Sequence, residues 1–180
     1  MNKMKQDAII VDLDRTLVDS SVRTKMHTLS NGKLDFDNLH KGILEFDKID
    51  DYVDDMIYNI EDYYDKCYKT LNIIFLSGRN KNAYDETWEF FDRDWYQYHK
   101  EKQLILRETN DYRPNHEFKK EHLLQLNEKY NIIMFIDDDI SCCAEAMKIG
   151  IPSFCYMSPH NLDNYTKNNI IKFAESLKNE

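Results

Sequence analysis

The chain has 180 residues, of which 42% are hydrophobic, 13% aromatic and 32% charged. This length suits one domain with its own hydrophobic core, so we expect a single domain over residues 1–180. The formal net charge of -9 argues against broad electrostatic binding to nucleic acid, which depends on clustered Lys and Arg. The four cysteines lack the paired spacing of a zinc site. The first apolar run is too short for a membrane span or a signal peptide, so we expect a cytoplasmic protein without a membrane partner.

Apolar runs of strand length recur along the chain, with helical spacing between them. The runs are Ala8 to Val11, Leu71 to Leu76, Leu104 to Leu106, Ile132 to Ile136 and Ile151 to Tyr156. They are continuous rather than alternating, which is typical of strands buried on both faces of a parallel sheet. Apolar residues at helical spacing are Tyr52, Ile57 and Ile60, then Trp88, Phe91 and Trp95, then Phe118, Leu123, Leu124 and Leu126. The alternation predicts an α/β fold in which helices flank a central parallel sheet.

The remaining segments are predicted from helix boundaries and charge. Asp139 can cap a helix from Ile140 to Ile149, which Gly150 ends, and Asn161 to Lys178 suggests a C-terminal helix. The acidic stretch 47–65 suggests the solvent face of a helix that buries its tyrosines and isoleucines. Residues 18–70 then leave room for at most a small helical cap insertion.

Polar residues follow three of the predicted strands. They are Asp12 and Asp14 after the first, Ser77, Gly78 and Arg79 at the end of the second, and Asp137, Asp138 and Asp139 at the end of the fourth. Each residue alone has an ordinary explanation, because aspartates often cap helices and Ser-Gly turns are common. Carboxylates about 4 Å apart repel by roughly 4 kcal/mol at an effective dielectric constant near 20, so their convergence requires a cation. All-oxygen ligands favour Mg2+, beside which one carboxylate can attack phosphorus and a second can transfer a proton.

The order of these motifs resembles the haloacid dehalogenase (HAD) superfamily, whose pattern is DxDx[TV], a strand-ending Ser or Thr, a Lys and a paired acid. The resemblance implies a Rossmann-like HAD fold and an aspartyl-phosphate intermediate. The implied catalytic residues are the nucleophile Asp12, the general acid and base Asp14, and the phosphoryl-binding residues Ser77 and Lys119. The implied Mg2+ ligands are Asp12, Asp14 through its backbone carbonyl, Asp137 and Asp138. Which member of the last pair binds the metal directly stays open.

A narrower resemblance is to the phosphatase domain of phage-type polynucleotide kinase-phosphatases. It is carried by Leu76 to Arg79, Leu106-Arg107, Asn110-Asp111, Arg113 and Lys119, and the spacing from Arg113 selects Lys119 over Lys120. The implied substrate-binding residues are Thr16, Arg23, Gly78, Arg79, Arg107 and Arg113. Three features depart from these relatives: Arg15 replaces a common glycine, Asn115 replaces an acidic residue four positions before the lysine, and no kinase P-loop occurs.

The substrate is where the signals conflict. A small cap would leave the site open to a nucleic-acid 3' end, whereas the acidic composition favours a mononucleotide. From the sequence we expect a 5'-nucleotidase that hydrolyses nucleoside or deoxynucleoside monophosphates, with a polynucleotide 3'-phosphatase as the alternative. A degenerate HAD fold that binds without catalysis is the non-enzyme alternative, and the intact Asp12 and Asp14 argue against it.

Overall fold

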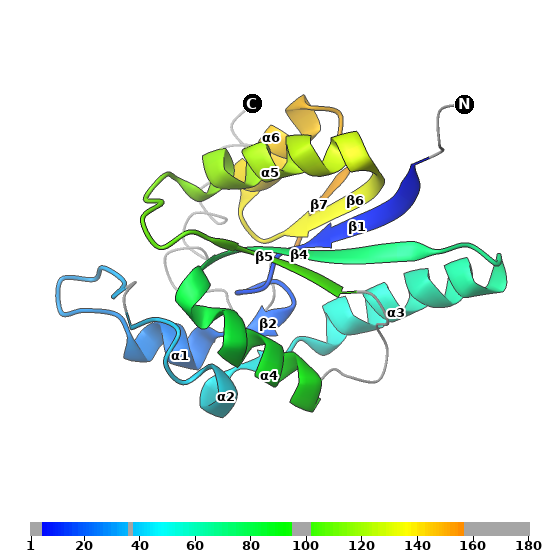
Figure 1. Ribbon diagram of the computed structural model, residues 1–180. Coiled ribbons are helices and arrows are strands. Elements are labelled where there is room, and N and C mark those ends of the chain that lie inside the picture. The colour runs from blue at the N-terminus through cyan, green and yellow to red at the C-terminus, as the bar shows by residue number, and fades with distance from the viewer. Residues whose placement is uncertain (1–4, 36–37, 95–101, 157–180) are drawn as a thin grey trace, which may run out of the picture.

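The chain forms a parallel β-sheet covered by helices on both faces. A computed structural model describes residues 5–35, 38–94 and 102–156 (Figure 1). In this part, the sheet has the strand order β5-β4-β1-β6-β7, and every pairing is parallel. The strands are β1 (Gln6–Val11), β4 (Leu71–Asn80), β5 (Lys102–Arg107), β6 (Tyr130–Asp137) and β7 (Ser153–Cys155). This arrangement confirms the α/β fold with a central parallel sheet that the sequence predicts.

Helices enclose the sheet in two layers. Figure 1 shows α5 (Asn115–Lys129) and α6 (Ile140–Lys148) over one face, and α3 (Asp51–Lys66) and α4 (Tyr84–Asp94) over the other. Alternate residues of β1 serve the two layers: Ile9 and Val11 pack in the core cluster of α3 and α4, and Ala8 and Ile10 in that of α5 and α6. Both faces of the strand are therefore buried, which explains its continuous apolar run.

The helix boundaries follow from local capping. Asp50 accepts hydrogen bonds from the backbone of Tyr52 and Val53 at the start of α3, and Asp139 accepts one from Ser141 N at 2.8 Å at the start of α6. Gly150 follows α6 with a φ of 82°, a left-handed conformation that costs glycine little. The C-terminal helix expected over 161–178 lies outside the described residues, as does Trp95.

The burial expected for α3 is wrong in one respect. Its buried face is made by Val53 and Ile57, whereas Tyr52, Tyr58 and Tyr63 are exposed. At about 100° per residue, the three tyrosines point roughly 100 to 120° away from the face of Val53 and Ile57. Within the described residues, no helix is long and apolar enough to cross a membrane.

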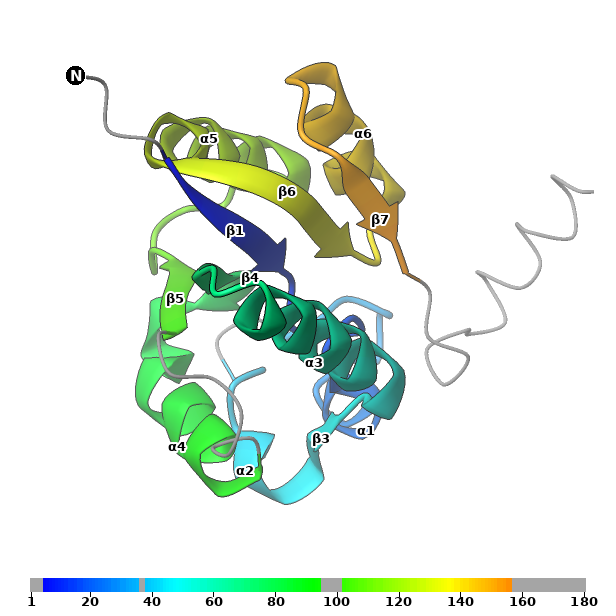
Figure 2. The ribbon, with the colours of Figure 1, turned by 90° about the vertical axis from the view of Figure 1, so that its right-hand side faces the viewer.

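An inserted segment separates β1 from α3. It contains β2 (Val18–Asp19), α1 (Ser21–Met26), α2 (Ile43–Phe46) and β3 (Lys48–Ile49), and α2 packs against α4 (Figure 2). β2 and β3 pair in antiparallel register, which closes the insertion at its base. Within the range 18–70 expected to hold a cap, α3 belongs to the helix layer of the sheet, and residues 18–50 form the inserted part.

Candidate active site

The site lies where the strand order reverses. β4 and β5 extend the sheet on one side of β1, and β6 and β7 extend it on the other. The order therefore reverses between β1 and β6, and ligands of open α/β sheets bind outside the carboxyl ends of the strands at such a point. Asp12 follows β1, and its backbone N donates to Ile136 O at 2.9 Å. Asp137 is the last residue of β6. Oxygens of Asp12, Asp137 and Asp138 lie within 4.8 Å of one another.

Lys119 connects two of these carboxylates. Its Nζ lies 2.7 Å from Asp12 Oδ1 and 2.7 Å from Asp137 Oδ2, and all three side chains are buried. The neighbouring Lys120 instead pairs with Glu145 at 2.7 Å near the surface. Adjacent residues on a helix point about 100° apart, so only one of the two lysines can reach Asp12 and Asp137.

The ionisation of the cluster reflects burial and mutual repulsion. Burial raises the pKa of Asp12 well above its ordinary value, helped by the charges of Asp137 and Asp138 and opposed by Lys119. Burial, together with the charge of Asp137, raises the pKa of Asp138 to about 6, although Arg15 opposes the shift. Burial alone would lower the pKa of Lys119, but the charges of Asp12 and Asp137 raise it well above normal. Three carboxylates around one ammonium retain excess negative charge, and an all-oxygen donor set of this kind could hold a divalent cation.

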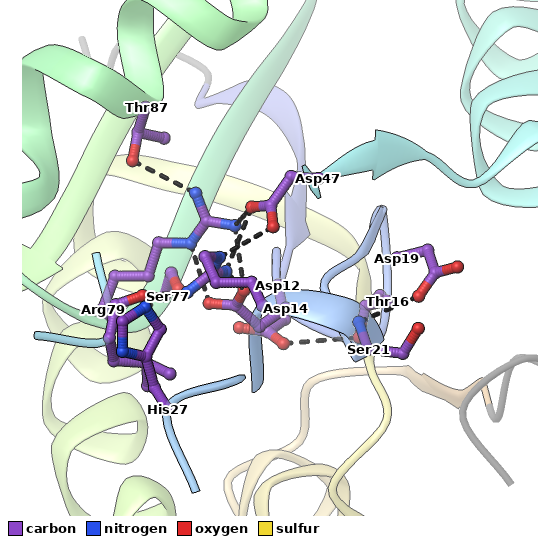
Figure 3. A network of polar contacts seen from close by, with 12 residues as sticks. Asp12, Asp14, Thr16, Asp19, Ser21, His27, Asp47, Ser77, Arg79 and Thr87 are labelled. Carbon is purple, nitrogen blue, oxygen red and sulfur yellow. Dashed lines mark hydrogen bonds and ion pairs between the residues drawn. The ribbon is translucent and has the colours of Figure 1, made fainter. Parts of the chain in front are cut away.

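A second group of charges surrounds Asp14 (Figure 3). Arg79 donates from Nε to Asp14 Oδ2 at 2.7 Å and from Nη2 to Asp14 Oδ1 at 2.8 Å, and Arg23 Nη2 also donates to Asp14 Oδ1. Burial would raise the pKa of Asp14, but the charges of Arg79 and Arg23 hold it below its ordinary value. Both arginines also bind Asp47.

The smaller residues of the motifs lie between these groups. The hydroxyl of Thr16 donates to Asp12 Oδ2 at 3.3 Å, and Ser77 Oγ accepts from Arg79 N at 3.2 Å. Gly78 packs against the side chain of Asn115, because a Cβ built at Gly78 would lie 2.6 Å from Asn115 Oδ1. Asn115 thus abuts the strand end that carries Ser77.

Arg107 and Arg113 lie on the other side of this strand end. Arg107 donates to Asn115 Oδ1 at 2.5 Å and to Arg113 O at 2.5 Å, and its guanidinium lies 4.6 Å from the centre of the Phe118 ring. Arg113 is 45% exposed and pairs with Asp111 and Glu121. Arg107 therefore holds Asn115, which packs against the end of β4. The Arg113 side chain instead forms its ion pairs with Asp111 and Glu121 at the surface.

Arg15 occupies a position with a left-handed backbone, at a φ of 69°. This conformation costs a non-glycine residue roughly 1 to 2 kcal/mol. Its Nε lies 3.5 Å from Asp138 Oδ2, so the Arg15 side chain places a positive charge beside the acidic cluster.

Asp47 and Thr87 are members of the site that sequence reasoning missed. Asp47 lies between α2 and β3 with its side chain fully buried, and Thr87 on α4 accepts from Arg79 Nη1 at 3.2 Å (Figure 3). The partners of Asp47 are Arg23 and Arg79, which lie 24 and 32 residues away in sequence, so no local spacing could reveal it. Thr87 lies 8 residues after Arg79 but belongs to no recognised motif. Asp47 also resembles the exposed acids that follow it on α3.

Comparison with known proteins gives one sequence family and several structures. No curated protein sequence matches the chain. Two structures of a Pnkp1/Rnl/Hen1 complex, one described as an RNA repair complex, match at 26% and 25% identity with TM-scores of 0.60. They cover 83% and 84% of this chain, which spans only 45% and 42% of theirs. The HAD domain of effector protein Lem4 from Legionella pneumophila matches at 13% identity and a TM-score of 0.50 over 92% of this chain and 93% of that domain, a likeness of fold alone.

The family match covers nearly the whole chain. A model described as HAD superfamily, subfamily IIIB (acid phosphatase), matches residues 1–177. This extent includes both the acidic cluster and the insertion. The chain belongs to the subfamily IIIB acid phosphatases of the HAD superfamily.

Proposed function

We propose that the protein is a Mg2+-dependent phosphomonoesterase that acts on a nucleotide-borne phosphate, with a phosphorylated RNA 3' end as its preferred substrate. One observation carries the catalytic part of this proposal. Lys119 Nζ lies 2.7 Å from a carboxylate oxygen of Asp12 and 2.7 Å from one of Asp137, with Asp138 beside them. The group lies where the strand order of the sheet reverses. Phosphoryl transfer to a carboxylate needs a nucleophile, a positive charge held in place and acidic residues. Asp12, the Lys119 ammonium group, and Asp137 with Asp138 would supply them.

The reaction proceeds in two steps. Asp12 attacks phosphorus and forms an aspartyl phosphate, while the ester oxygen leaves with a proton from Asp14. Because Arg23 and Arg79 lower the pKa of Asp14 in the free protein, this step needs the negative charge of the bound phosphoryl group to raise that pKa. Asp14 then accepts a proton from water as the water oxygen attacks the aspartyl phosphate, which releases inorganic phosphate and restores Asp12. Lys119 and Ser77 hold the phosphoryl oxygens, and Thr16 orients Asp12 through its hydrogen bond to Oδ2.

Asp12, Asp138 and the backbone carbonyl of Asp14 would hold Mg2+. We favour Asp138 over Asp137 as the direct ligand because both oxygens of Asp137 are engaged, one by Lys119 and the other by Asp139 N at 2.8 Å. When bound, the cation supplies positive charge that offsets the negative charge of the carboxylates and the phosphoryl group.

Two observations bear on the substrate and point in different directions. The likeness to chains of an RNA repair complex, at about a quarter sequence identity, supports a polynucleotide end. The net charge of -9 supports the mononucleotide that the sequence alone favours. We rank the RNA end first because the structural likeness covers more than four fifths of this chain. The net charge belongs to the whole chain and does not give the charge around the site.

A substrate panel tests this proposal. Phosphate release is measured with p-nitrophenyl phosphate, nucleoside 5'- and 3'-monophosphates and 3'-phosphorylated oligoribonucleotides, each with Mg2+ and with excess chelator. We expect Mg2+-dependent release from all of them and the highest kcat/KM for the oligoribonucleotide. A higher kcat/KM for the 5'-monophosphate would make the nucleotidase correct, and release that persists in chelator would contradict the metal site.

The matched variants are Asp12→Asn and Asp139→Asn. Asp12→Asn should abolish turnover because an amide cannot form the acyl phosphate. Asp139→Asn makes the same chemical change at the cap of α6, where asparagine is also a good cap, and should retain activity. Substantial turnover by Asp12→Asn would reject the nucleophile, and absence of turnover by the parent on every ester would favour the binding-only alternative.

A further inference from the structure

Two arginines bridge the same two carboxylates next to the proposed general acid. Arg23 Nη2 donates both to Asp14 Oδ1 and, at 3.0 Å, to Asp47 Oδ2. Arg79 Nη2 does the same, at 2.8 Å to each oxygen. The four side chains therefore form a closed group of two positive and two negative charges, which we call the Arg-Asp quartet (Asp14, Arg23, Asp47 and Arg79).

The remaining donors of both arginines are also engaged. Arg23 Nε donates to Asp47 Oδ1 at 2.7 Å and Nη1 to Leu39 O at 2.5 Å. Arg79 Nε donates to Asp14 Oδ2 and Nη1 to Thr87 Oγ1. Every guanidinium nitrogen thus has a protein acceptor. The direct substrate contact expected for these two arginines stays a prediction.

Exposure separates the members of the quartet. The side chains of Arg23, Arg79 and Asp47 are 1%, 3% and 0% exposed, whereas that of Asp14 is 29% exposed. Within the quartet, only the Asp14 side chain is therefore substantially exposed. The side chains of the other three residues are buried around it. Without Asp47, two buried guanidinium charges would face a single carboxylate, and an unpaired buried charge is strongly unfavourable.

We infer that Asp47 is a positioning residue for catalysis, which fixes Arg23 and Arg79 and through them the orientation of the Asp14 carboxyl group. This inference rests on the proposed function, in which Asp14 protonates the leaving group. It also gives the insertion a role: Asp47 lies directly before β3, and the pairing of β3 with β2 fixes where its side chain enters the core.

The inference predicts an effect that depends on the leaving group. A misplaced Asp14 harms the step that protonates the ester oxygen, and p-nitrophenolate leaves without that proton whereas a ribose oxygen does not. Asp47→Asn should therefore lower kcat on a nucleotide ester at least about tenfold more than on p-nitrophenyl phosphate, with little change in KM. Turnover of p-nitrophenyl phosphate also reports that the variant is folded.

Two further variants complete the experiment. Glu45→Gln makes the same chemical change on an exposed residue of the insertion and should leave both rates unchanged. Thr87→Val removes one acceptor of Arg79 with little change in shape, and should show the same leaving-group dependence more weakly. It also tests the inference if Asp47→Asn does not fold.

The outcomes separate this inference from the proposed function. Equal losses on both esters would mean that Asp47 is only structural, and unchanged rates would mean that it has no part in catalysis. A raised KM at constant kcat would assign the arginines to substrate binding instead. Each of these results overturns the inference while leaving the phosphatase activity established, whereas a parent protein that hydrolyses neither ester overturns both.

Discussion

At the scale of single residues, Lys119 and Lys120 are neighbours on α5 with different surroundings. Lys119 is buried between Asp12 and Asp137, and Lys120 pairs with Glu145 near the surface. Lys119→Met keeps the aliphatic stem but removes the charge, so we expect a loss of roughly 2.7 to 4 kcal/mol of transition-state stabilisation, or about 100- to 1000-fold in kcat. Lys120→Met should stay within about twofold, since exposed ion pairs contribute at most about 1 kcal/mol. Steady-state kinetics of both variants test this, and a larger effect at Lys120 would contradict the site.

Asp138 gives a second prediction at this scale, which concerns stability and pH. Its pKa is raised to about 6 in the folded protein, against roughly 3.9 in an unfolded chain. Between these values the folded state binds a proton that the unfolded state does not, so stability falls as pH rises through this window. Without Mg2+, Asp138→Asn should therefore be more stable than the parent at pH 7, on the order of 2 kcal/mol, and nearly equal to it at pH 4.

Urea unfolding in excess chelator at the two pH values measures this difference. Addition of Mg2+ at pH 7 should stabilise the parent selectively, because the cation favours the ionised carboxylate that the variant lacks. A variant that is less stable than the parent in chelator at pH 7 would contradict the raised pKa.

At the scale of elements, the end of β4 and the start of α5 are held in close contact. Gly78 leaves no space for a Cβ beside Asn115 Oδ1, and Arg107 fixes that amide at 2.5 Å. Gly78→Ala should therefore lower the free energy of unfolding by roughly 1 to 3 kcal/mol, as overpacking does. Asn115→Ala removes the obstructing amide, so the double variant should be less destabilised than the sum of the single ones. Urea unfolding of the four proteins in the cycle measures the coupling, and strict additivity would show that the contact is absent.

At the scale of the whole molecule, the net charge of -9 limits how the chain can bind a polynucleotide. The guanidiniums of Arg23, Arg79 and Arg107 are engaged by protein acceptors, so they are poorly placed to follow a phosphate backbone. We expect kcat/KM on a 3'-phosphorylated oligoribonucleotide to fall only slightly with salt, with a logarithmic slope between about -0.7 and -1.4, equivalent to one or two phosphates on a single strand. A slope steeper than about -3 would show extended contact with the backbone. A neutral osmolyte at equal osmolarity serves as the control.

The sequence by itself determined the sheet and the position of the acidic cluster. Continuous apolar runs marked the strands, and Asp12, Asp137 and Asp138 follow two of them, so parallel pairing was enough to bring these carboxylates to one edge. The two ends of α6 could also be predicted from the sequence, because Asp139 and Gly150 lie within one helical turn of the backbone groups that they cap. These features could be predicted because each depends on local spacing or on the common direction of the strands.

Only the tertiary structure decided which charges pair and which side chains are buried. Asp47 and its partner Arg79 are 32 residues apart, and Asp47 resembles the exposed acids that follow it on α3 until the insertion folds it into the core. Tyr52 and Tyr58 were expected inside and lie outside, because a helix can bury only the face that its neighbours cover. The physical reason is the same in both cases: long-range ion pairing and burial depend on how separate elements pack, and no spacing along the chain encodes that packing directly.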